Sequence, residues 1–558
     1  MGDLFRGGSP PQSTAEFWRV ASIPRRIYSA SEQETIRQEM TKLLRRPGGQ
    51  GELWTSQAVS LFDLSFAGGL VGAIPAGNGK TLISLLAPTV WRCARPVLLV
   101  PAALVEKTKR AYRELSAHWR MSPSIRVWSY EWLGRTGAKQ ALDEWRPDII
   151  VADEGHYLAN TSAGVTRRVG RYLKANPETI FAVMSGTISK RSVLDYAHLV
   201  EWAFRRSPIS TPVPLAFQEL VTWASVIDEG AAPDADPGIL WHLCNDEEQA
   251  RGGLSAIRSA YRRRLTETQG FVQVNGGDGE VTIPLIISTT RPDLPRGLAE
   301  ALREMRDSWQ TPDGVEFLTA MERWRHCREL ALGFYYRWTT QPPPEWREAR
   351  KAWAATARWI VEHGRKHVDT VLDASLAIDR GQYPEYAPIL EAWRGIKDTF
   401  EPETEAVWLD DHVIKWADHW LTKHKGPHLI WVEHRTMGER LSHALGLPFY
   451  CPEDARGRSL LDHNVRQSAI LSAHACKQGF DLQWCSSNVI LGPLTSARGW
   501  EQKLARTHRV KQKADQVTVM VPIWCDEHQM AIDQAISDAH YLRDSLGNSQ
   551  RLLHADWS

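Results

Sequence analysis

A glycine-rich segment near residue 80 has the residue types that phosphate chemistry needs. Residues 77–81 read Gly-Asn-Gly-Lys-Thr and follow a short apolar run. Glycines leave room for backbone N–H groups to close around phosphate oxygens, Lys80 can reach the β- and γ-phosphates, and the Thr81 hydroxyl can ligate Mg²⁺. The longer GxxxxGK[ST] pattern lacks its first glycine, because Ile74 stands there. Taken alone, the segment fits either a nucleotide-binding loop or an ordinary glycine-rich turn.

Two acidic residues, Asp153 and Glu154, follow another apolar run at 148–152. Beside a phosphate loop, an aspartate can hold Mg²⁺ through water, and a glutamate can orient and deprotonate an attacking water. The alternative is an acidic pair that caps the start of a helix. We expect the acids and the glycine-rich segment on adjacent strands of one sheet, and this combination favours a nucleotide-hydrolysing site.

Two arginines three residues apart, Arg506 and Arg509, lie in a basic segment near the C-terminus. This spacing places both on one helix face, from which they can stabilise charge on a transferring phosphoryl group. A basic solvated helix is the alternative for this segment alone. Upstream of the glycine-rich segment, the Gln57 amide can read an adenine edge with its donor and acceptor, or can simply lie at a solvated helix start.

The pattern along the chain indicates two α/β sheets that would position these residues. Short apolar runs alternate with helical patterns, and polar residues follow the runs. This arrangement is typical of open parallel sheets, which bind ligands at the carboxyl ends of their strands. The expected strands are 96–100, 125–130, 148–152 and 179–184 in the first sheet, and 427–432, 447–450, 468–472, 488–491 and 517–521 in the second.

The segment between the two sheets has long amphipathic helical patterns and one β-like patch at 281–287. A chain of 558 residues exceeds what one core can organise. We therefore expect an N-terminal extension (1–50), a first α/β domain (51–204), a mainly helical insertion and linker (205–420), a second α/β domain (421–525) and a helical tail (526–558).

The overall composition narrows the class of protein. Net charge is only +1, so nucleic-acid binding would need local basic patches. The 7 cysteines form no CxxC pair, which argues against a disulfide framework or a structural zinc site. Without an apolar run of about 20 residues or a signal-peptide pattern, we expect a soluble intracellular protein, cytoplasmic or with the nucleoid or nucleus, and no membrane partner. The 25 tryptophans fit packing anchors better than base-stacking groups.

Together, these motifs resemble those of the superfamily 2 helicase-type ATPases, most closely the Swi/Snf branch of double-stranded-DNA translocases. The similarity covers about residues 53–200 and 429–521. The matching residues of the main motifs are Gln57, Gly77, Gly79, Lys80, Thr81, the run 153–160, Ser185, Gly186, Thr187, Gln502, Arg506, His508, Arg509 and Gln512. Further segments resemble motif Ia (97–107), the Ser-Tyr-Glu segment (129–131), motif V (472–482) and the basic segment in the helical insertion of that branch (261–264).

Several positions depart from the pattern of that branch. The residues at 74–76 and Asn78 stand where it usually carries an acidic pair and Met-Gly-Leu. Ile188 replaces a usual proline, Asp481 a usual asparagine and Ala505 a usual glycine. None of these changes removes a group needed for phosphate or metal chemistry. They bear instead on whether such a motor only translocates or also separates strands.

The resemblance implies two RecA-like domains in tandem that hydrolyse ATP with Mg²⁺ and move along nucleic acid. ATP would bind to Gln57, Gly77, Asn78, Gly79, Lys80 and Thr81, and Mg²⁺ to Thr81 and Asp153. The chemistry would involve Lys80, Asp153, Glu154, Arg506 and Arg509. Coupling of hydrolysis to movement would involve His156, Ser185, Thr187, Gly479 and Gln502. The contacts with nucleic acid would come from Pro101, Lys107, Ser129 and Ser472.

The partner expected from this resemblance is DNA in double-stranded form, with partner proteins docking on the helical insertion. A strand-separating DNA or RNA helicase of the same superfamily is one alternative. A nucleotide-switched nucleic-acid-binding scaffold that hydrolyses slowly is the other.

Overall fold

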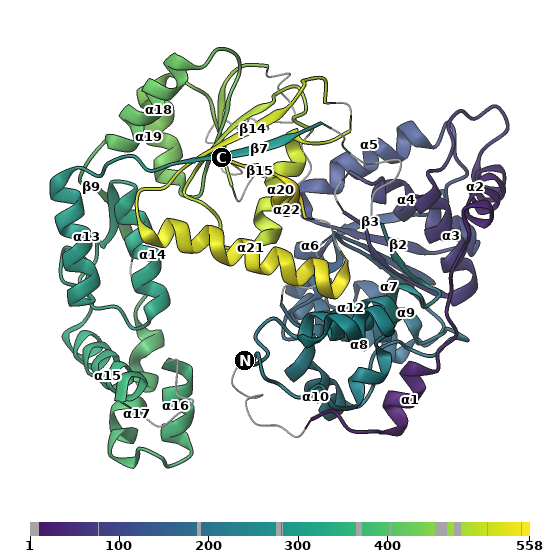
Figure 1. The fold of residues 1–558 in the computed structure, drawn as a ribbon, viewed down its shortest axis with the longest axis horizontal. Helices are drawn as coiled ribbons and strands as arrows, with labels where there is room; N and C mark the ends of the chain where they lie inside the picture. The colour runs from purple at the N-terminus through teal and green to yellow at the C-terminus, as the bar shows by residue number, and fades with distance from the viewer. Residues whose placement is uncertain are drawn as a thin grey trace.

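The computed structural model contains two parallel β-sheets flanked by helices, and a helical arm (Figure 1). Its described residues are 10–75, 77–186, 191–274, 281, 283–363, 371–401, 403–451, 466–473, 481–510, 512–547 and 550–558. In these residues the first sheet has the strand order β3-β2-β4-β5-β1-β6, and the second has the order β11-β12-β10-β13-β14-β7-β15. The predicted α/β fold with two parallel sheets is confirmed.

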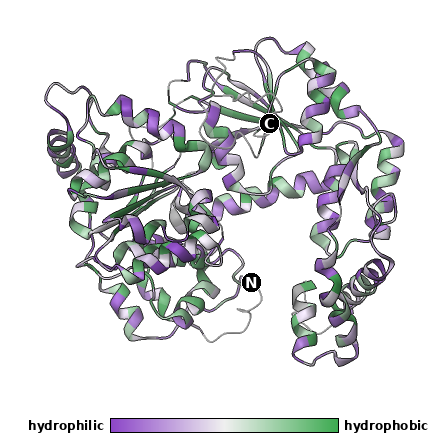
Figure 2. Ribbon diagram, turned by 180° about the vertical axis from the view of Figure 1, so that it is seen from behind, coloured by the Kyte–Doolittle hydropathy of each residue, from purple (hydrophilic) through white to green (hydrophobic). Residues whose placement is uncertain are grey.

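The first sheet is built from short apolar runs. Its strands are β1 (Gly69–Ala73), β2 (Pro96–Val100), β3 (Arg126–Ser129), β4 (Ile149–Asp153), β5 (Ile180–Met184) and β6 (Phe271–Gln273). Around it lie α3 (Thr55–Ala67), α4 (Lys80–Val90), α5 (Val105–Leu115), α6 (Tyr130–Gly134), α7 (Ala141–Trp145), α8 (Gly164–Ala175) and α9 (Ala197–Phe204). Every residue of β1, β2, β4 and β5 is buried, because helices cover both faces of this sheet. In Figure 2 these strands are largely green, the colour of hydrophobic residues.

Alternate residues of these strands enter two separate hydrophobic clusters, one on each face of the sheet. In β4, Ile150 and Ala152 belong to one cluster, while Ile149 and Val151 belong to the other. This follows from the period of two of a β-strand, whose successive side chains point to opposite faces. Both faces of the sheet are therefore covered by apolar packing, and the polar residues lie at the strand ends.

The second sheet has the same character. Its strands are β7 (Leu285–Thr290), β10 (Leu429–Val432), β11 (Phe449–Tyr450), β12 (Ala469–Ser472), β13 (Ser487–Leu491), β14 (Val517–Pro522) and β15 (Asp556–Trp557). Its helices include α18 (His412–Lys423), α19 (Arg435–Leu445) and α20 (Ala497–Thr507). All of the strand pairs are parallel, and β10 lies between β12 and β13.

The chain crosses from the first sheet to the second between Gln273 and Leu285, which differs from the division expected from sequence. Helices α10 (Phe217–Ile227), α11 (Asp246–Arg251) and α12 (Gly253–Thr266) belong with the first sheet, to which β6 adds an edge strand beside β1. The β-like patch becomes β7, an inner strand of the second sheet between β14 and β15. Long-range pairing of this kind leaves no local mark in the sequence.

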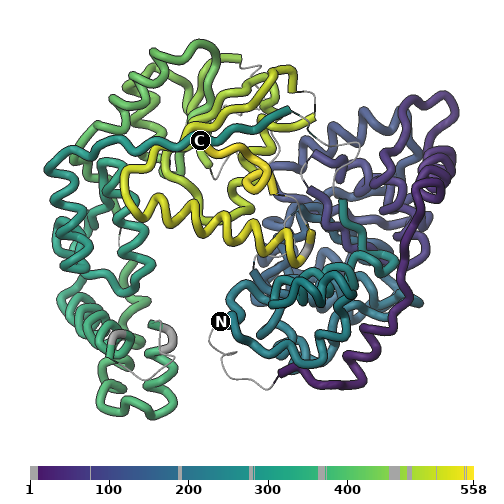
Figure 3. Tube along the Cα trace, viewed as in Figure 1, coloured from purple at the N-terminus to yellow at the C-terminus, as the bar shows by residue number. Residues whose placement is uncertain are grey.

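The remaining part of the expected insertion forms an arm that extends from the second sheet (Figures 1 and 3). The arm contains α13 (Arg296–Ser308), α14 (Ala320–Ala331), β8 (Phe334–Trp338), α15 (Pro344–His363), α16 (Val371–Asp379), α17 (Ala387–Ile396) and β9 (Thr404–Trp408). Strands β8 and β9 pair antiparallel. The distal helices have a small core of their own around Trp353, Ala357 and Ile360.

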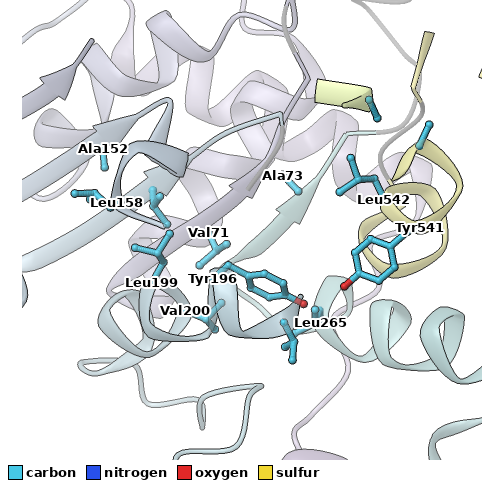
Figure 4. Packing of buried hydrophobic residues seen from close by; sticks show 14 of the residues in the cluster. Val71, Ala73, Ala152, Leu158, Tyr196, Leu199, Val200, Leu265, Tyr541 and Leu542 are labelled. Carbon is cyan, nitrogen blue, oxygen red and sulfur yellow. The ribbon is translucent and has the colours of Figure 1, made fainter. Parts of the chain in front are cut away.

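The C-terminal segment connects the two halves of the molecule. Helix α21 (Asp526–Leu546) leaves the second sheet and packs against α12 of the first domain, and the chain then returns through α22 (Arg551–His554) to β15. Tyr541 and Leu542 enter the same hydrophobic cluster as Val71, Tyr196 and Leu265 (Figure 4). The segment expected to be a helical tail (526–558) therefore contributes Tyr541, Leu542 and Leu552 to the core.

The N-terminal segment also packs on the first domain. Helix α1 (Ala15–Ala21) buries Phe17 against Trp223, with ring centroids 6.1 Å apart. Helix α2 (Ala30–Leu44) packs along α3. Among the described residues, no helix combines the length and apolar character needed to cross a membrane.

Candidate active site

The glycine-rich segment forms a turn between the buried strand β1 and helix α4. Gly77 and Gly79 have φ values of 96° and 70°, in the left-handed region that glycine adopts most easily. Gly79 immediately precedes the first residue of α4, Lys80, so backbone N–H groups at this helix start face out of the turn. Ala76 lies outside the described residues. The segment is therefore a glycine-rich turn that leads from a buried strand into a helix.

Gln57 packs directly on this turn. Its Oε1 accepts a hydrogen bond from the Trp54 backbone N–H at 2.9 Å, and its Nε2 donates to the Gly79 carbonyl at 3.4 Å. A Cβ added at Gly79 would lie 2.1 Å from Gln57 Nε2. The left-handed backbone angle favours glycine at 79, and any larger residue would also displace the end of the Gln57 side chain. Asn78 and Thr81 are partly exposed at the same turn.

Lys80 joins the turn to the end of β4. Its buried ammonium donates to the Ile74 carbonyl at 3.0 Å and forms an ion pair with Glu154 Oε1 at 3.3 Å. The predicted neighbourhood of the turn and the acidic pair is confirmed by this contact. The expectation of adjacent strands is wrong, because β5 lies between β1 and β4. Helix α4 packs against β4 instead, and this brings Lys80 across the intervening strand.

The two acids occupy the last position of β4 and the residue after it. Glu154 has φ of 55°, an uncommon conformation for a residue with a side chain, and its backbone N–H donates to Asp153 Oδ1 at 3.0 Å. The Tyr130 hydroxyl donates to the Asp153 carbonyl at 2.8 Å. These bonds hold the strained turn at the end of β4.

The environment drives the two carboxyl groups to different protonation states. Burial, together with the neighbouring Glu154 charge, raises the pKa of Asp153 to about 7. Burial also opposes ionisation of Glu154, but the Lys80 ammonium and His156 outweigh it and hold the pKa of Glu154 well below its ordinary value. A cation placed at Asp153 would favour its ionised form for the same electrostatic reason.

His156 connects Glu154 to the end of β5. Its Nδ1 lies 3.3 Å from Glu154 Oε2 and 3.0 Å from Ser185 Oγ, and burial lowers the pKa of the ring to about 4. The Ser185 backbone N–H donates to the Gly72 carbonyl of β1 at 2.9 Å. The ends of β1, β4 and β5 are thus connected by polar contacts. Thr187, expected beside Ser185, lies outside the described residues.

Helix α20 of the second domain carries Arg506, whereas Arg509 lies two residues beyond the last residue of the helix. The expectation that one helix face holds both arginines is therefore wrong, because the helix ends at Thr507. Arg506 and Gln502 are buried, and Arg506 Nε donates to the Gln502 carbonyl at 2.9 Å. Burial and the nearby Arg509 charge lower the pKa of Arg506 to about 10, against an opposite effect from Glu154. Arg506 therefore lies within electrostatic reach of the acid on the other domain. Gly479, the remaining coupling residue expected from sequence, lies outside the described residues.

A further arginine on this helix, Arg498, was missed by sequence reasoning. Burial lowers its pKa, and the Glu154 charge acts in the opposite direction. It stands one helical turn before Gln502 and two turns before Arg506, so the three share a face. The spacing of four residues was the signal that could have found it.

The predicted nucleic-acid contacts are divided between the two sheets. Pro101 follows β2, and Ser129 ends the neighbouring strand β3, so these two lie side by side at the carboxyl ends of the strands. Ser129 Oγ accepts a hydrogen bond from the Trp132 backbone N–H and caps α6, and Ser472 ends β12 in the second sheet. Lys107 Nζ lies 3.4 Å from Asp481 Oδ1 and so forms an ion pair between the first and the second domain.

Comparison with known proteins adds nothing to this geometry, because no protein-family model and no curated protein matches the chain. In the described part of the chain, no group of three or more His, Cys, Asp or Glu side chains could hold a metal ion. The hydroxyl of Thr81 and the carboxylate of Asp153 are oxygen donors of the kind that Mg²⁺ takes when water and phosphate supply its other ligands.

Proposed function

We propose that the protein is an ATP-hydrolysing nucleic-acid motor whose nucleotide binds between its two domains. The observation that carries this proposal is the buried ion pair of Lys80 and Glu154 at 3.3 Å, beside a left-handed glycine turn at a helix start. Phosphoryl transfer needs a phosphate-binding lysine and a water-orienting carboxylate within a few ångströms of each other. Arg506, on α20 of the other domain, and Arg509, just beyond that helix, would complete this set of groups.

On ATP binding, backbone N–H groups at the start of α4 would receive phosphate oxygens, and Gln57 would contact the base. Lys80 would exchange its partner Glu154 for the β- and γ-phosphates. Loss of that ion pair would raise the pKa of Glu154 towards the range of a useful general base, because the Lys80 charge is a main cause of its low value. The Glu154 carboxylate would then accept a proton from the attacking water.

Mg²⁺ held by Thr81 and Asp153 would supply positive charge to the phosphate oxygens. Arg506 and Arg509 would add charge-assisted hydrogen bonds from the second domain. Because these groups belong to different domains, nucleotide binding favours domain closure, and loss of the γ-phosphate favours opening. His156, which contacts Ser185, and Gln502, which contacts Arg506, would transmit closure between the strand ends and α20.

The nucleic acid of this motor would be DNA in duplex form, contacted along its phosphate backbone. These contacts would be made by Pro101 and Ser129 at the strand ends of the first sheet, together with Ser472 and Lys107. They would not depend on base sequence and would weaken steeply with salt. Release of Lys107 from Asp481 would accompany binding.

The proposal is tested by ATP hydrolysis measured with duplex DNA, single-stranded DNA and RNA. Duplex DNA is expected to stimulate turnover most. Glu154→Gln should lower the rate by about 10²–10⁴-fold, the usual contribution of a general base. Lys80→Ala should also abolish most turnover, whereas Lys109→Ala, which removes an exposed lysine paired with Glu106 on α5, should not.

Each other outcome has a definite meaning. Undiminished turnover in both Lys80→Ala and Glu154→Gln would refute the site. Stimulation by forked duplexes with strand separation, without displacement of a triplex strand, would identify a strand-separating helicase. Slow hydrolysis that no nucleic acid stimulates would identify a nucleotide-switched scaffold instead of a motor.

A further inference from the structure

A second candidate binding site lies along the free edge of the first sheet. Strand β3 is the terminal strand there, and the groove beside it encloses about 650 Å³. This volume is within the range of sites that hold small organic ligands or parts of larger ones. The groove is formed by β3, α6, α7 and the short turn between the two helices, and none of its residues takes part in the candidate ATP site.

Three indole rings line this groove, from Trp128, Trp132 and Trp145. The rings of Trp128 and Trp132 have centroids 5.1 Å apart at an angle of 57°, and Trp132 is 40% exposed. The Arg126 guanidinium lies 3.4 Å from the centroid of the Trp145 ring. Trp128 and Trp145 are partly buried, so the exposed Trp132 ring is the flat apolar surface suited to stacking with a flat ligand.

The rim of the groove is polar and mainly basic. Exposed Arg126 and Lys139 contribute positive charge, Gln140 contributes an amide, and Glu144 contributes one negative charge. Indole faces interleaved with cations match a single nucleic-acid strand, whose bases stack and whose phosphates are negative. A proline-rich peptide would use the indoles but would leave these cations without a role.

We propose that this groove binds unpaired nucleotides of a single nucleic-acid strand, with one base stacked on Trp132 and with Lys139 near a phosphate. Its position supports this occupant. Ser129, the last residue of the same strand β3, is one of the residues proposed to contact a nucleic-acid backbone. The proposal deepens the proposed motor function and rests on it for the source of the strand. The groove itself binds without nucleotide and without hydrolysis.

The test is binding of a fluorescein-labelled 12-residue oligothymidylate, followed by anisotropy without ATP. Trp132→Ala should weaken binding by about 5- to 100-fold, as loss of one stacked base does, and Trp132→Phe should retain most of the affinity. Lys139→Glu should also weaken binding and reduce its salt dependence. Trp359→Ala is the matched control, because Trp359 is 45% exposed on the arm and should have no effect.

Equal binding by the wild type and Trp132→Ala would overturn the proposal. Trp132-dependent binding of a proline decapeptide, with none of the oligothymidylate, would also overturn it in favour of a peptide site. A parallel 12-residue oligouridylate distinguishes RNA from DNA as the source of the strand, and either result supports the groove.

Failure of the motor and failure of the groove can be told apart. Suppose that oligonucleotide binding depends on Trp132 but that no nucleic acid stimulates ATP hydrolysis. This result would support the proposed binding groove and refute the proposed motor function. Stimulated hydrolysis that Trp132→Ala leaves unchanged, together with unchanged oligonucleotide binding, would reject the groove alone. Lys80→Ala should bind the oligonucleotide as the wild type does.

Discussion

Asp481 is the residue whose substitution most directly tests how the two domains are held before nucleotide binds. Its carboxylate contacts Arg509 within the second domain and lies 3.4 Å from Lys107 Nζ on the first. Although burial acts in the opposite direction, the charges of Lys107 and Arg509 hold the pKa of Asp481 below its ordinary value. Arg509 must leave this carboxylate before it can reach a phosphate. We predict that Asp481→Asn raises the rate of ATP hydrolysis measured without nucleic acid.

The expected size of this increase follows from the exposure of the three side chains. Lys107 is 39% exposed, Asp481 48% and Arg509 23%, so both ion pairs are partly hydrated. Pairs of this kind contribute about 0.2–1 kcal/mol each, and solvent screening favours the lower half of that range. A combined effect of about 0.5–1 kcal/mol corresponds to a two- to fivefold faster basal rate. The difference should shrink as salt is raised, because salt screens exposed charges.

The assay is steady-state ATP hydrolysis without nucleic acid at low and high salt. Asp379→Asn is the matched control: Asp379 pairs with Arg394 at 2.8 Å on the arm, with 43% and 44% exposure. It removes a similar surface ion pair far from the candidate site and should leave the rate unchanged. A basal rate that falls in Asp481→Asn would mean that the carboxylate positions Arg509 for the reaction, and the reasoning would be refuted.

Three other substitutions have definite expected results. Gly79→Ala should weaken ATP binding about 5- to 30-fold in a titration with a fluorescent nucleotide, because its methyl group would displace the end of the Gln57 side chain, whose Nε2 would lie 2.1 Å away, and the left-handed angle adds strain of about 1–2 kcal/mol. Asp63→Ala should lower the free energy of unfolding in urea by about 3–5 kcal/mol, because it leaves the Arg26 charge buried without its carboxylate partner. Asp228→Asn should make stability less dependent on pH: burial raises the Asp228 pKa from 3.8 to about 7, so the folded chain binds the extra proton and loses stability as pH rises from 4 to 7.

Each of these has an outcome that would contradict it. Gly297→Ala, at a helical position with nothing within 4 Å, controls for glycine replacement, and equal nucleotide binding by Gly79→Ala would refute the steric argument. Unfolding of Asp63→Ala at the wild-type urea concentration would show that Arg26 reaches water. At pH 8, Asp228→Asn should be more stable than the wild type by up to about 4 kcal/mol, and lower stability there would show that the fold does not raise the pKa of Asp228.

The candidate site could be located from the sequence because its signals are local. A buried strand, two glycines and a lysine at a helix start lie within about a dozen residues, and Asp153 and Glu154 end their own apolar run. The order of the strands could not be predicted in the same way. That β5 separates β1 from β4 depends on side-chain packing between segments about a hundred residues apart.

The expectations that differ most from the structure concern segments whose partners lie far away in the sequence. Residues 281–287 looked like a brief interruption of a helical insertion, yet β7 pairs with β14 more than 200 residues later. The polar pattern of α21 concealed a buried face, because its apolar residues are few and pack at the junction of two domains. Arg498 was overlooked because its role depends on which face of α20 meets the first domain.

The route of the C-terminal segment has a consequence for synthesis of the protein. Strand β7 emerges from the ribosome long before β14 and β15, its two neighbours in the sheet. Tyr541 and Leu542 complete the apolar packing around Tyr196 and Leu265 only after α21 has been made (Figure 4). The first domain and the second sheet therefore both depend on the segment after residue 525. A chain that ended near residue 525 would expose apolar surface in both of them.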